Sequence, residues 1–492
     1  MSRLSGVLLP VFSLPGQGGI GSLGEEAYRF ADFLHESGCH IWQVLPMGPT
    51  GYGESPYQST STYAGNPLLI SLETLKREGL VTFAEEELKT ASSPDRIDYE
   101  SVRTVHERLL HRAFSESYDR LEADIRAFEK SQSWVHDFAL FTALKKHFGN
   151  AAWQSWPEEG LRLRRPRELA EWEQKLSREI AYEVFVQYLF DRQWERLHAY
   201  CRRLDIRLFG DMPIYVAEDS ADTWTNPRVF QLDRNRVPKR VAGVPPDYFS
   251  ADGQLWGNPL YNWTYLRLTG FAWWVQRMTH MAHMYDIVRI DHFIGLANYY
   301  SIPYGAKNAR IGKWVNAPGK ALLKTLKRRL PDLSIIAEDL GCVNDRVRRL
   351  IDWSGYPGMR VLVFGFEGES NVHHPSHWVP HCVAYTGTHD NDTVVGFLKR
   401  ASEEVLAGAR ATTGMTDLTD AAHAFVHTAL ASCADTVIIP MQDLLGLDNR
   451  ARMNVPSTIG TNWLWRMQET DLTDALSSWL KDENEKTGRI TE

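Results

Sequence analysis

The sequence predicts an α/β protein built on a (β/α)8 TIM barrel, with helical and loop insertions between the strands. Eight short apolar segments bounded by turns alternate with amphipathic stretches, a pattern typical of parallel sheets. Several segments are near-continuous hydrophobic runs, as strands that are covered on both faces require. The predicted strands are 7–14, 41–47, 207–216, 286–293, 334–340, 359–366, 382–388 and 436–442.

Composition limits the class of protein and its partners. Of the 492 residues, 43% are hydrophobic and 24% are charged, as in ordinary globular proteins. The formal net charge of −8 argues against a nucleic acid, because phosphate backbones require clustered Lys and Arg. Five scattered cysteines without a CxxC pair indicate reduced thiols and a cytoplasmic location. No apolar stretch approaches the ~18 residues of a membrane span, so no membrane partner is expected.

The segments between the strands predict the outer helices and two insertions. Amphipathic patterns place helices at 23–37, 178–204, 271–284 and 320–330. The gap between the second and third strands is far longer than one helix needs, and helical apolar spacing predicts an insertion subdomain at 75–170. Residues 217–262 are rich in Pro, Gly, Asp and aromatics, and we expect them to form a loop region over the catalytic face.

Two patterns resemble cofactor or metal sites and are interpreted otherwise. Residues 16–21 fit G-x-G-x-x-G between a strand and a helix, but the next strand lacks the acid that binds a ribose. We expect a tight loop at the barrel mouth and no cofactor. Four histidines cluster at 373–381, but Pro375 interrupts any helix that would align them, so a surface loop is predicted.

Acidic residues lie at or near the ends of four predicted strands. They are Asp211, Asp291, Glu338 and Asp390. Strand C-termini converge on one mouth of a barrel, so these carboxylates are expected to meet. The alternative is that each acid caps the following helix. Gathering several carboxylates is costly unless function requires it, and this favours a catalytic site.

The spacing around Asp291 suggests a division of labour between two acids. Arg289 lies two residues before Asp291, so both side chains face the same side of a strand. We expect Arg289 to lower the pKa of Asp291 and keep this nucleophile ionised. Glu338 must begin protonated to act as a general acid. Two such carboxylates about 5–5.5 Å apart perform retaining glycosidic chemistry.

The strings RIDHFIG at 289–295, AEDLG at 337–341 and YTGTHDND at 385–392 resemble the signature motifs of the amylomaltase family. These are 4-α-glucanotransferases related to the α-amylases. The resemblance extends over nearly the whole chain, with long segments at 48–70, 210–224, 243–263 and 452–466. It implies a barrel without the usual C-terminal β domain. It also implies transfer of α-1,4-glucan segments between maltodextrins, or glucans derived from starch or glycogen.

The resemblance also implies roles for individual residues. Asp291 is the nucleophile, Glu338 the general acid/base, and Asp390 a third carboxylate that binds and distorts the donor sugar. The implied substrate-binding residues are Tyr57, Asp211, Phe249, Trp256, Arg289, His389 and Asn462. Tyr52 lies in a segment linked to a second glucan-binding region. Ser457 departs from the family pattern, which has glycine in a Pro-Gly-Thr turn.

The carboxylates alone do not distinguish transfer from hydrolysis, because water and a sugar hydroxyl attack the same intermediate. Transfer needs an acceptor site and restricted water access, which the aromatic segment 243–263 is suited to supply. Two alternatives stay open, a retaining α-glucan hydrolase and a noncatalytic maltodextrin-binding protein. The sequence does not fix the preferred glucan length, the formation of cyclic glucans or the oligomeric state.

Overall fold

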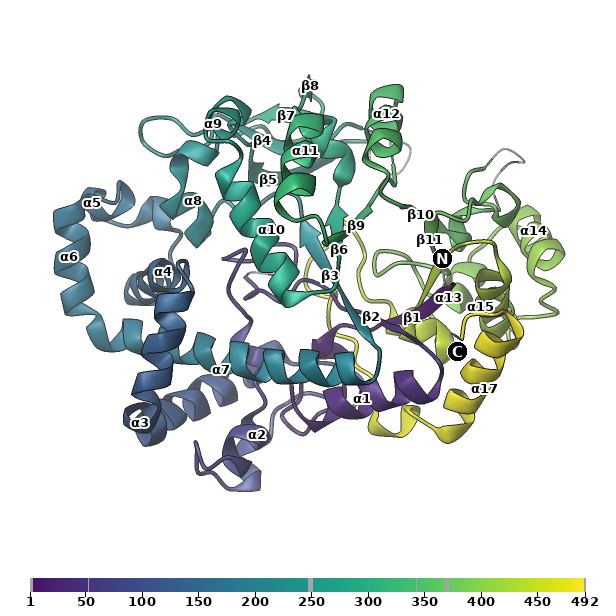
Figure 1. Ribbon diagram of the computed structural model, residues 1–492, viewed down its shortest axis with the longest axis horizontal. Helices are drawn as coiled ribbons and strands as arrows, with labels where there is room; N and C mark the ends of the chain where they lie inside the picture. The colour runs from purple at the N-terminus through teal and green to yellow at the C-terminus, as the bar shows by residue number, and fades with distance from the viewer. Residues whose placement is uncertain are drawn as a thin grey trace.

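The computed structural model describes residues 3–51, 53–246, 251–341, 343–366, 368 and 371–490. Its centre is an eight-stranded parallel sheet in the order β10-β11-β12-β1-β2-β3-β6-β9 (Figure 1). The strands are β1 (Leu4–Leu8), β2 (Ile41–Gln43), β3 (Arg207–Pro213), β6 (Ile287–Asp291), β9 (Ser334–Ala337), β10 (Gly358–Val361), β11 (Cys382–Tyr385) and β12 (Thr436–Pro440).

The sheet curls into a nearly closed barrel. Between its two edge strands, β9 and β10, the Ala337 N–H donates to the Pro357 carbonyl at 3.0 Å. The Met359 N–H next to it donates to the Asp339 carboxylate at 2.7 Å. The predicted (β/α)8 class is therefore confirmed, and each of the eight predicted strand segments overlaps a barrel strand.

The predicted strand boundaries are less accurate than the strand positions. The first strand was expected at 7–14 but lies at Leu4–Leu8, because Pro10 has no N–H to donate and residues Val11–Ser13 turn into a 3-10 helix. The segment predicted at 359–366 likewise ends its pairing at Val361 and continues as a 3-10 helix, Leu362–Phe364. Most apolar residues beyond the ladder, such as Leu14 and Leu362, are buried without being paired in the sheet, whereas Phe364 is exposed.

Helices surround the barrel, and the four that the periodicity predicted are present. They are α1 (Glu25–Glu36), α7 (Ser177–Arg203), α10 (Ala272–Met284) and α11 (Gly319–Arg329). The later outer helices are α12 (Asp345–Ser354), α13 (Val394–Leu398), α14 (Glu403–Thr413), α15 (Ala421–Ala431), α16 (Met441–Leu444) and α17 (Asp474–Lys486). After β12 the chain continues in α16 and α17, and Arg489 returns to donate to the Leu4 carbonyl of β1 at 3.1 Å. No helix among the residues described is long and apolar enough to cross a membrane.

A group of helices extends the molecule on the side opposite α17 (Figure 1). Its members are α2 (Leu72–Arg77), α3 (Tyr99–Ser131), α4 (Val135–His147), α5 (Glu159–Arg162), α6 (Pro166–Lys175) and α8 (Ala221–Thr225). Both α3 and α4 pack against α7. Phe114 of α3 meets Phe185 of α7 edge to face at 5.5 Å, so aromatic packing joins this group to a helix of the barrel.

A second, antiparallel sheet was not predicted. It has the order β5-β4-β7-β8, with β4 (Arg240–Val244), β5 (Gln254–Pro259), β7 (Asn298–Pro303) and β8 (Lys313–Asn316). The region expected as a loop at 217–262 therefore contains the helix α8 and two strands, and the helix α9 (Trp263–Leu268) follows directly after it. Glycines interrupt the strand pattern of β4 and β5. β4 pairs with β5 on one side and, on the other, with β7, which follows β6 much later in the chain.

Candidate active site

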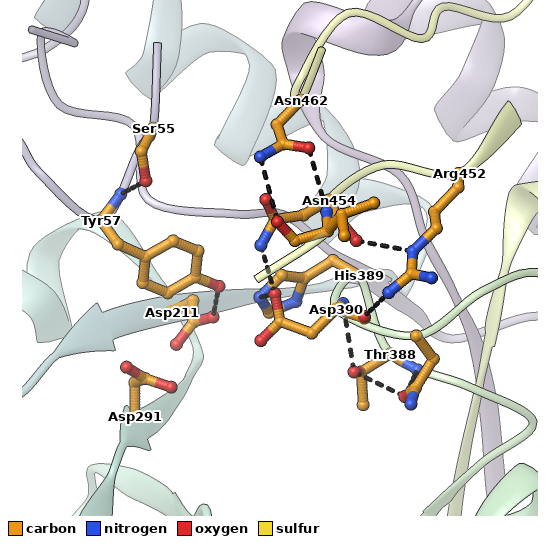
Figure 2. Close-up of polar contacts among 12 residues, drawn as sticks. Ser55, Tyr57, Asp211, Asp291, Thr388, His389, Asp390, Arg452, Asn454 and Asn462 are labelled. Carbon is orange, nitrogen blue, oxygen red and sulfur yellow. Dashed lines mark hydrogen bonds and ion pairs between the residues drawn. The ribbon is translucent and has the colours of Figure 1, made fainter. Parts of the chain in front are cut away.

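A buried arginine, Arg289, contacts both Asp211 and Asp291, two of the carboxylates that Figure 2 labels. Arg289 lies two positions before the end of β6 and donates to both carboxylate oxygens of Asp211, at 3.0 and 2.7 Å. Its Nη2 also lies 3.0 Å from Asp291 Oδ1. The Tyr57 hydroxyl donates to Asp211 Oδ2 at 2.6 Å. The Asp211 side chain is 0% exposed, so it holds Arg289 and Tyr57 rather than lining the cleft surface itself.

Asp291 and Glu338 end neighbouring strands. Their predecessors, Ile290 and Ala337, form the last pair between β6 and β9, and Asp291 still pairs with Pro213 of β3. Glu338 accepts hydrogen bonds from the backbone N–H groups of His292 and Leu340, at 2.8 and 2.7 Å. His292 has φ of 52°, a left-handed conformation that turns the chain directly after the strand and presents its N–H to Glu338. Strand register and one strained turn thus determine the positions of the two candidate catalytic acids.

The pKa of Asp291 differs from the prediction. Burial raises it well above its usual range, and the nearby carboxylates of Asp211 and Glu338 add to this, while Arg289 opposes it. Arg289 lowers the pKa of Asp291, as expected, but the expected net lowering is wrong, because one shared guanidinium does not offset burial among several acids. Burial also raises the pKa of Glu338, to about 7. Asp291 and Glu338 thus form an interacting pair of acids, since the charge of Glu338 raises the pKa of Asp291.

Within this pair the surroundings differ. Asp291 contacts a guanidinium and keeps a side chain that is 30% exposed. Glu338 is 7% exposed and accepts from neutral backbone N–H groups. When the pair holds one proton, these contacts favour the anion on Asp291 and the proton on Glu338.

Asp390 reaches the mouth from a loop instead of a strand. It lies five residues after the end of β11, and its side chain is 50% exposed. Figure 2 shows its carboxylate on the side of the site that faces Asp211 and Asp291. His389 is buried, which lowers its pKa, and its Nε2 lies 3.5 Å from Asp390 Oδ1. The His389 ring stacks on Tyr57 with centroids 5.1 Å apart.

Two residues that the sequence reasoning did not single out hold this loop. Asn454 Nδ2 donates to Asp390 Oδ1 at 2.6 Å, and Arg452 Nη2 donates to the Asp390 carbonyl at 2.8 Å (Figure 2). Both belong to the segment 452–466, which resembles an amylomaltase motif. Nothing local in that motif indicates a contact with a residue more than 60 positions away.

The aromatic residues expected to stack on glucose are partly described. Trp256, on β5, is half-buried and meets His292 edge to face, with centroids 4.8 Å apart. Its Nε1 donates to Gln254 Oε1 at 3.0 Å. The second sheet thus brings Trp256 beside the residue that follows Asp291. Phe249 and Tyr52 lie outside the described residues.

Asn462 is bonded within its own loop. Its amide accepts from the Val455 N–H at 3.0 Å and donates to the Thr458 carbonyl at 2.9 Å. Between these residues Ser457 has φ of 66°, in the left-handed region that favours glycine. The backbone conformation at this position favours glycine, which is the residue of the family pattern. Ser457 adopts the same conformation with a side chain.

One group of side chains in the described part of the chain has the ligand types of a metal site. Asp191 and Glu195 of α7 and His283 of α10 bring their ligand atoms within 4.8 Å of one another. His283 Nε2 lies 3.9 Å from Asp191 and 3.7 Å from Glu195, and its pKa is raised by Asp191. These contacts are those of ion pairs between two helices, and none of the three residues belongs to the barrel mouth described above.

The fold and the site together define a class of protein. A parallel barrel that gathers carboxylates, an arginine and a histidine at the carboxyl ends of its strands is suited to retaining chemistry on glycosidic bonds. The neutral His389 and the buried Arg289 suit a polar, uncharged sugar, which is bound by directed hydrogen bonds.

Comparison with known proteins identifies the family. The family model described as 4-alpha-glucanotransferase, glycoside hydrolase family 77, matches residues 9–473. The 4-alpha-glucanotransferases of Streptococcus pneumoniae serotype 4 and Thermus thermophilus are 42% and 41% identical, over 100% of this chain and 98% and 100% of theirs. The solved amylomaltase from Streptococcus agalactiae in complex with acarbose has a TM-score of 0.96 at 40% identity, covering 99% of both chains.

The chain belongs to the 4-alpha-glucanotransferase family. It is a 4-α-glucanotransferase, an amylomaltase that acts on α-1,4-glucans. Among the predicted alternatives, transfer is thereby favoured over a dedicated hydrolase and over a noncatalytic glucan-binding protein.

Proposed function

We propose that the chain transfers α-1,4-glucan segments by a retaining double displacement, with Asp291 as nucleophile and Glu338 as general acid/base. The observation that carries this proposal is the contrast between two adjacent strand ends. Asp291 contacts Arg289 at 3.0 Å, while Glu338 is buried with its pKa raised to about 7. Burial raises the pKa of Asp291 as well, so the guanidinium contact and the 30% exposure of its side chain are what favour the negative charge on Asp291 and the proton on Glu338.

In the first step Glu338 donates its proton to the glycosidic oxygen while Asp291 attacks the anomeric carbon. The bond to the leaving glucan breaks, and a covalent ester on Asp291 forms. Esterification removes the negative charge of Asp291, which makes Glu338 a stronger acid. In the second step the Glu338 carboxylate takes the proton of an acceptor hydroxyl. The acceptor oxygen attacks the anomeric carbon from the face that the leaving glucan occupied, opposite the ester, and the bond to Asp291 breaks.

The remaining residues bind or position the donor sugar. We assign Asp390 as the third carboxylate. Arg289, His389 and Tyr57 are assigned to bind the same sugar, and Asp211 is assigned to orient Arg289 through their ion pair. Trp256 is assigned to stack on a glucose ring, as is Phe249. Asn462 shapes the 455–462 loop, since its amide bonds to that loop.

The proposed substrates are maltodextrins and glucans derived from starch or glycogen, acting as both donor and acceptor. The acarbose bound to the Streptococcus agalactiae amylomaltase supports an oligosaccharide ligand of this kind. We further propose action in the cytoplasm, where free thiols such as Cys39 and Cys201 persist. Nucleic acids and membranes are not proposed as partners.

We also propose a division of the chain around one catalytic barrel. Residues 75–170 form the helical insertion subdomain, and the packing of α3 and α4 on α7 supports this. Residues 217–262 form the region over the cleft, which the position of Trp256 beside His292 supports.

The test of the residue roles is a pair of isosteric variants, Asp291→Asn and Glu338→Gln. Each is expected to lower turnover of maltodextrins by roughly 10³-fold or more, because one displacement partner is lost. Asp345→Asn, at an exposed carboxylate paired with Arg348, is the control. Unfolding curves establish that the variants fold, and near-normal turnover in either would sink the assignment.

A further inference from the structure

We propose that Asn454 and Arg452 are positioning residues that orient the Asp390 carboxylate toward the donor sugar. The inference rests on the proposed role of Asp390 as the third carboxylate. In Figure 2 Arg452 lies on the side of Asp390 away from Asp211 and Asp291, and Asn454 lies between the Asp390 carboxylate and Asn462. The two residues come from the segment that follows the last barrel strand, whereas Asp390 follows β11.

Asp390 needs such support because its backbone lies outside the barrel ladder. Asp211 and Asp291 are held by strand pairing, whereas Asp390 lies in a loop and its side chain is 50% exposed. The Asp390 N–H donates to Thr388 Oγ1 at 3.3 Å, which bends the loop but does not fix the carboxylate. A carboxylate that turns freely loses orientation toward its substrate, and a displacement of about 1 Å can cost roughly 10²-fold in rate.

Asn454 fixes one oxygen of that carboxylate. Its Nδ2 donates to Asp390 Oδ1 at 2.6 Å, and His389 Nε2 lies 3.5 Å from the same oxygen. Both contacts engage Oδ1, and this leaves Oδ2 for sugar hydroxyls. An amide suits this place because it donates a hydrogen bond without adding a charge beside the other acids of the mouth.

Arg452 fixes the two backbones to each other. Its Nη2 donates to the Asp390 carbonyl at 2.8 Å and its Nε donates to the Asn454 carbonyl at 2.8 Å. A third nitrogen, Nη1, lies 4.0 Å from Asp392 Oδ2. The planar guanidinium thus binds backbone carbonyls on two loops through two nitrogens whose relative positions are fixed. A lysine ammonium at this position has no such pair of fixed donors.

A purely structural cross-link between the loops would show the same hydrogen bonds. The test therefore measures how kcat/KM depends on pH and whether a substitution changes kcat more than KM. The titratable or charged groups that interact with Asp390 are His389, Tyr57, Arg452 and, across the mouth, Asp291. In Asn454→Asp a second carboxylate replaces the donor and competes with Asp390 for one proton. That pair stays protonated to higher pH than one carboxylate, so the acid limb of kcat/KM is expected to move up.

Four variants are compared by steady-state kinetics with maltotriose across pH, each with its unfolding midpoint. Asn454→Ala is expected to lower kcat by about 10- to 100-fold with a smaller change in KM. Asn454→Asp is expected to move the acid limb up by about one pH unit or more. Arg452→Lys is expected to lower kcat although the charge is kept. Asn449→Asp, an exposed position on the same segment, adds an equal charge and is expected to leave the acid limb unchanged.

Asp390→Asn separates failure of the inference from failure of the proposed function. If Asp390→Asn keeps near-normal kcat, the role of Asp390 is wrong and the inference falls with it. If Asp390→Asn is inactive while the acid limb of Asn454→Asp and the kcat of Asn454→Ala match the parent enzyme, only the positioning inference is overturned. Should Asn454→Asp not fold, the kcat of Arg452→Lys at an unchanged unfolding midpoint decides the question.

Discussion

Arg289 and Asp211 form a bidentate ion pair beneath the proposed nucleophile, with Nε–Oδ1 and Nη2–Oδ2 distances of 3.0 and 2.7 Å. Their side chains are 4% and 0% exposed. The strand register places Asp211 opposite Arg289, so the pair is a product of the β3–β6 ladder. Asp211 fixes the orientation of the Arg289 guanidinium, and the same guanidinium also contacts Asp291.

The first prediction concerns the loss of this pair. Asp211→Ala leaves the Arg289 charge buried with only Asp291 to balance it. We expect a loss of about 3–5 kcal/mol in the free energy of unfolding, because one partner of a buried pair is removed. Urea unfolding measures this. The exposed pair Arg348–Asp345 offers the control Asp345→Ala, for which little change is expected. Equal, small effects of both substitutions would contradict the buried-pair account.

The second prediction follows from the pKa of Glu338, which burial raises to about 7. A general acid works only while it is protonated, so its contribution is complete below this pKa and is lost as the pH rises through it. We therefore expect kcat/KM to fall on the alkaline side with a midpoint near 7, measured with maltotriose at constant ionic strength. In Glu338→Gln, assayed with an activated donor that needs no protonation, that alkaline limb should vanish. A retained limb would show that another group titrates.

The third prediction concerns Trp256 and the balance between transfer and hydrolysis. If Trp256 stacks on a glucose ring, Trp256→Ala weakens sugar binding and opens the site to water. We expect a larger share of turnovers to end in hydrolysis, seen as a faster rise in reducing ends during incubation with maltotriose. Trp314→Ala is the matched control, because Trp314 is 41% exposed on β8 of the same sheet. An unchanged ratio of products in Trp256→Ala would contradict this role.

The fourth prediction concerns Ser457, which has φ of 66°. A left-handed conformation costs a residue with a side chain about 1–2 kcal/mol, and glycine loses roughly 0.5–1 kcal/mol more backbone entropy on folding. Ser457→Gly is therefore expected to stabilise the protein by about 0.5–1 kcal/mol, measured as a raised urea midpoint. The opposite sign is expected for Ser334→Gly, since Ser334 begins β9. A lowered midpoint in Ser457→Gly would contradict the strain argument.

Much of the fold was predictable because the barrel strands carry their signal locally. Buried strands read as apolar runs, and Arg289 and Asp291 are brought to one face by a spacing of two. The second sheet escaped prediction because β4 contains Gly243 and pairs with β7, far along the chain. Its strands are short and partly exposed, so their pattern resembles a loop.

The charged residues of the site could be predicted from the sequence, but the residues that hold them in place could not. Asp390 was recognised by its motif, whereas Asn454 and Arg452 reach it across more than 60 positions. The raised pKa of Asp291 depends on how deeply the carboxylates are buried together, and sequence spacing does not give that depth.

The most direct measurement of the central claim is the trapping of a covalent intermediate on Asp291. Glu338→Gln is incubated with an α-maltosyl fluoride, whose leaving group needs no general acid, and the digested protein is examined by mass spectrometry. The first displacement should proceed while the second lacks its base, so a maltosyl adduct should accumulate on the peptide that contains Asp291. An adduct on another carboxylate, or fluoride release with no adduct in a folded variant, would contradict the account.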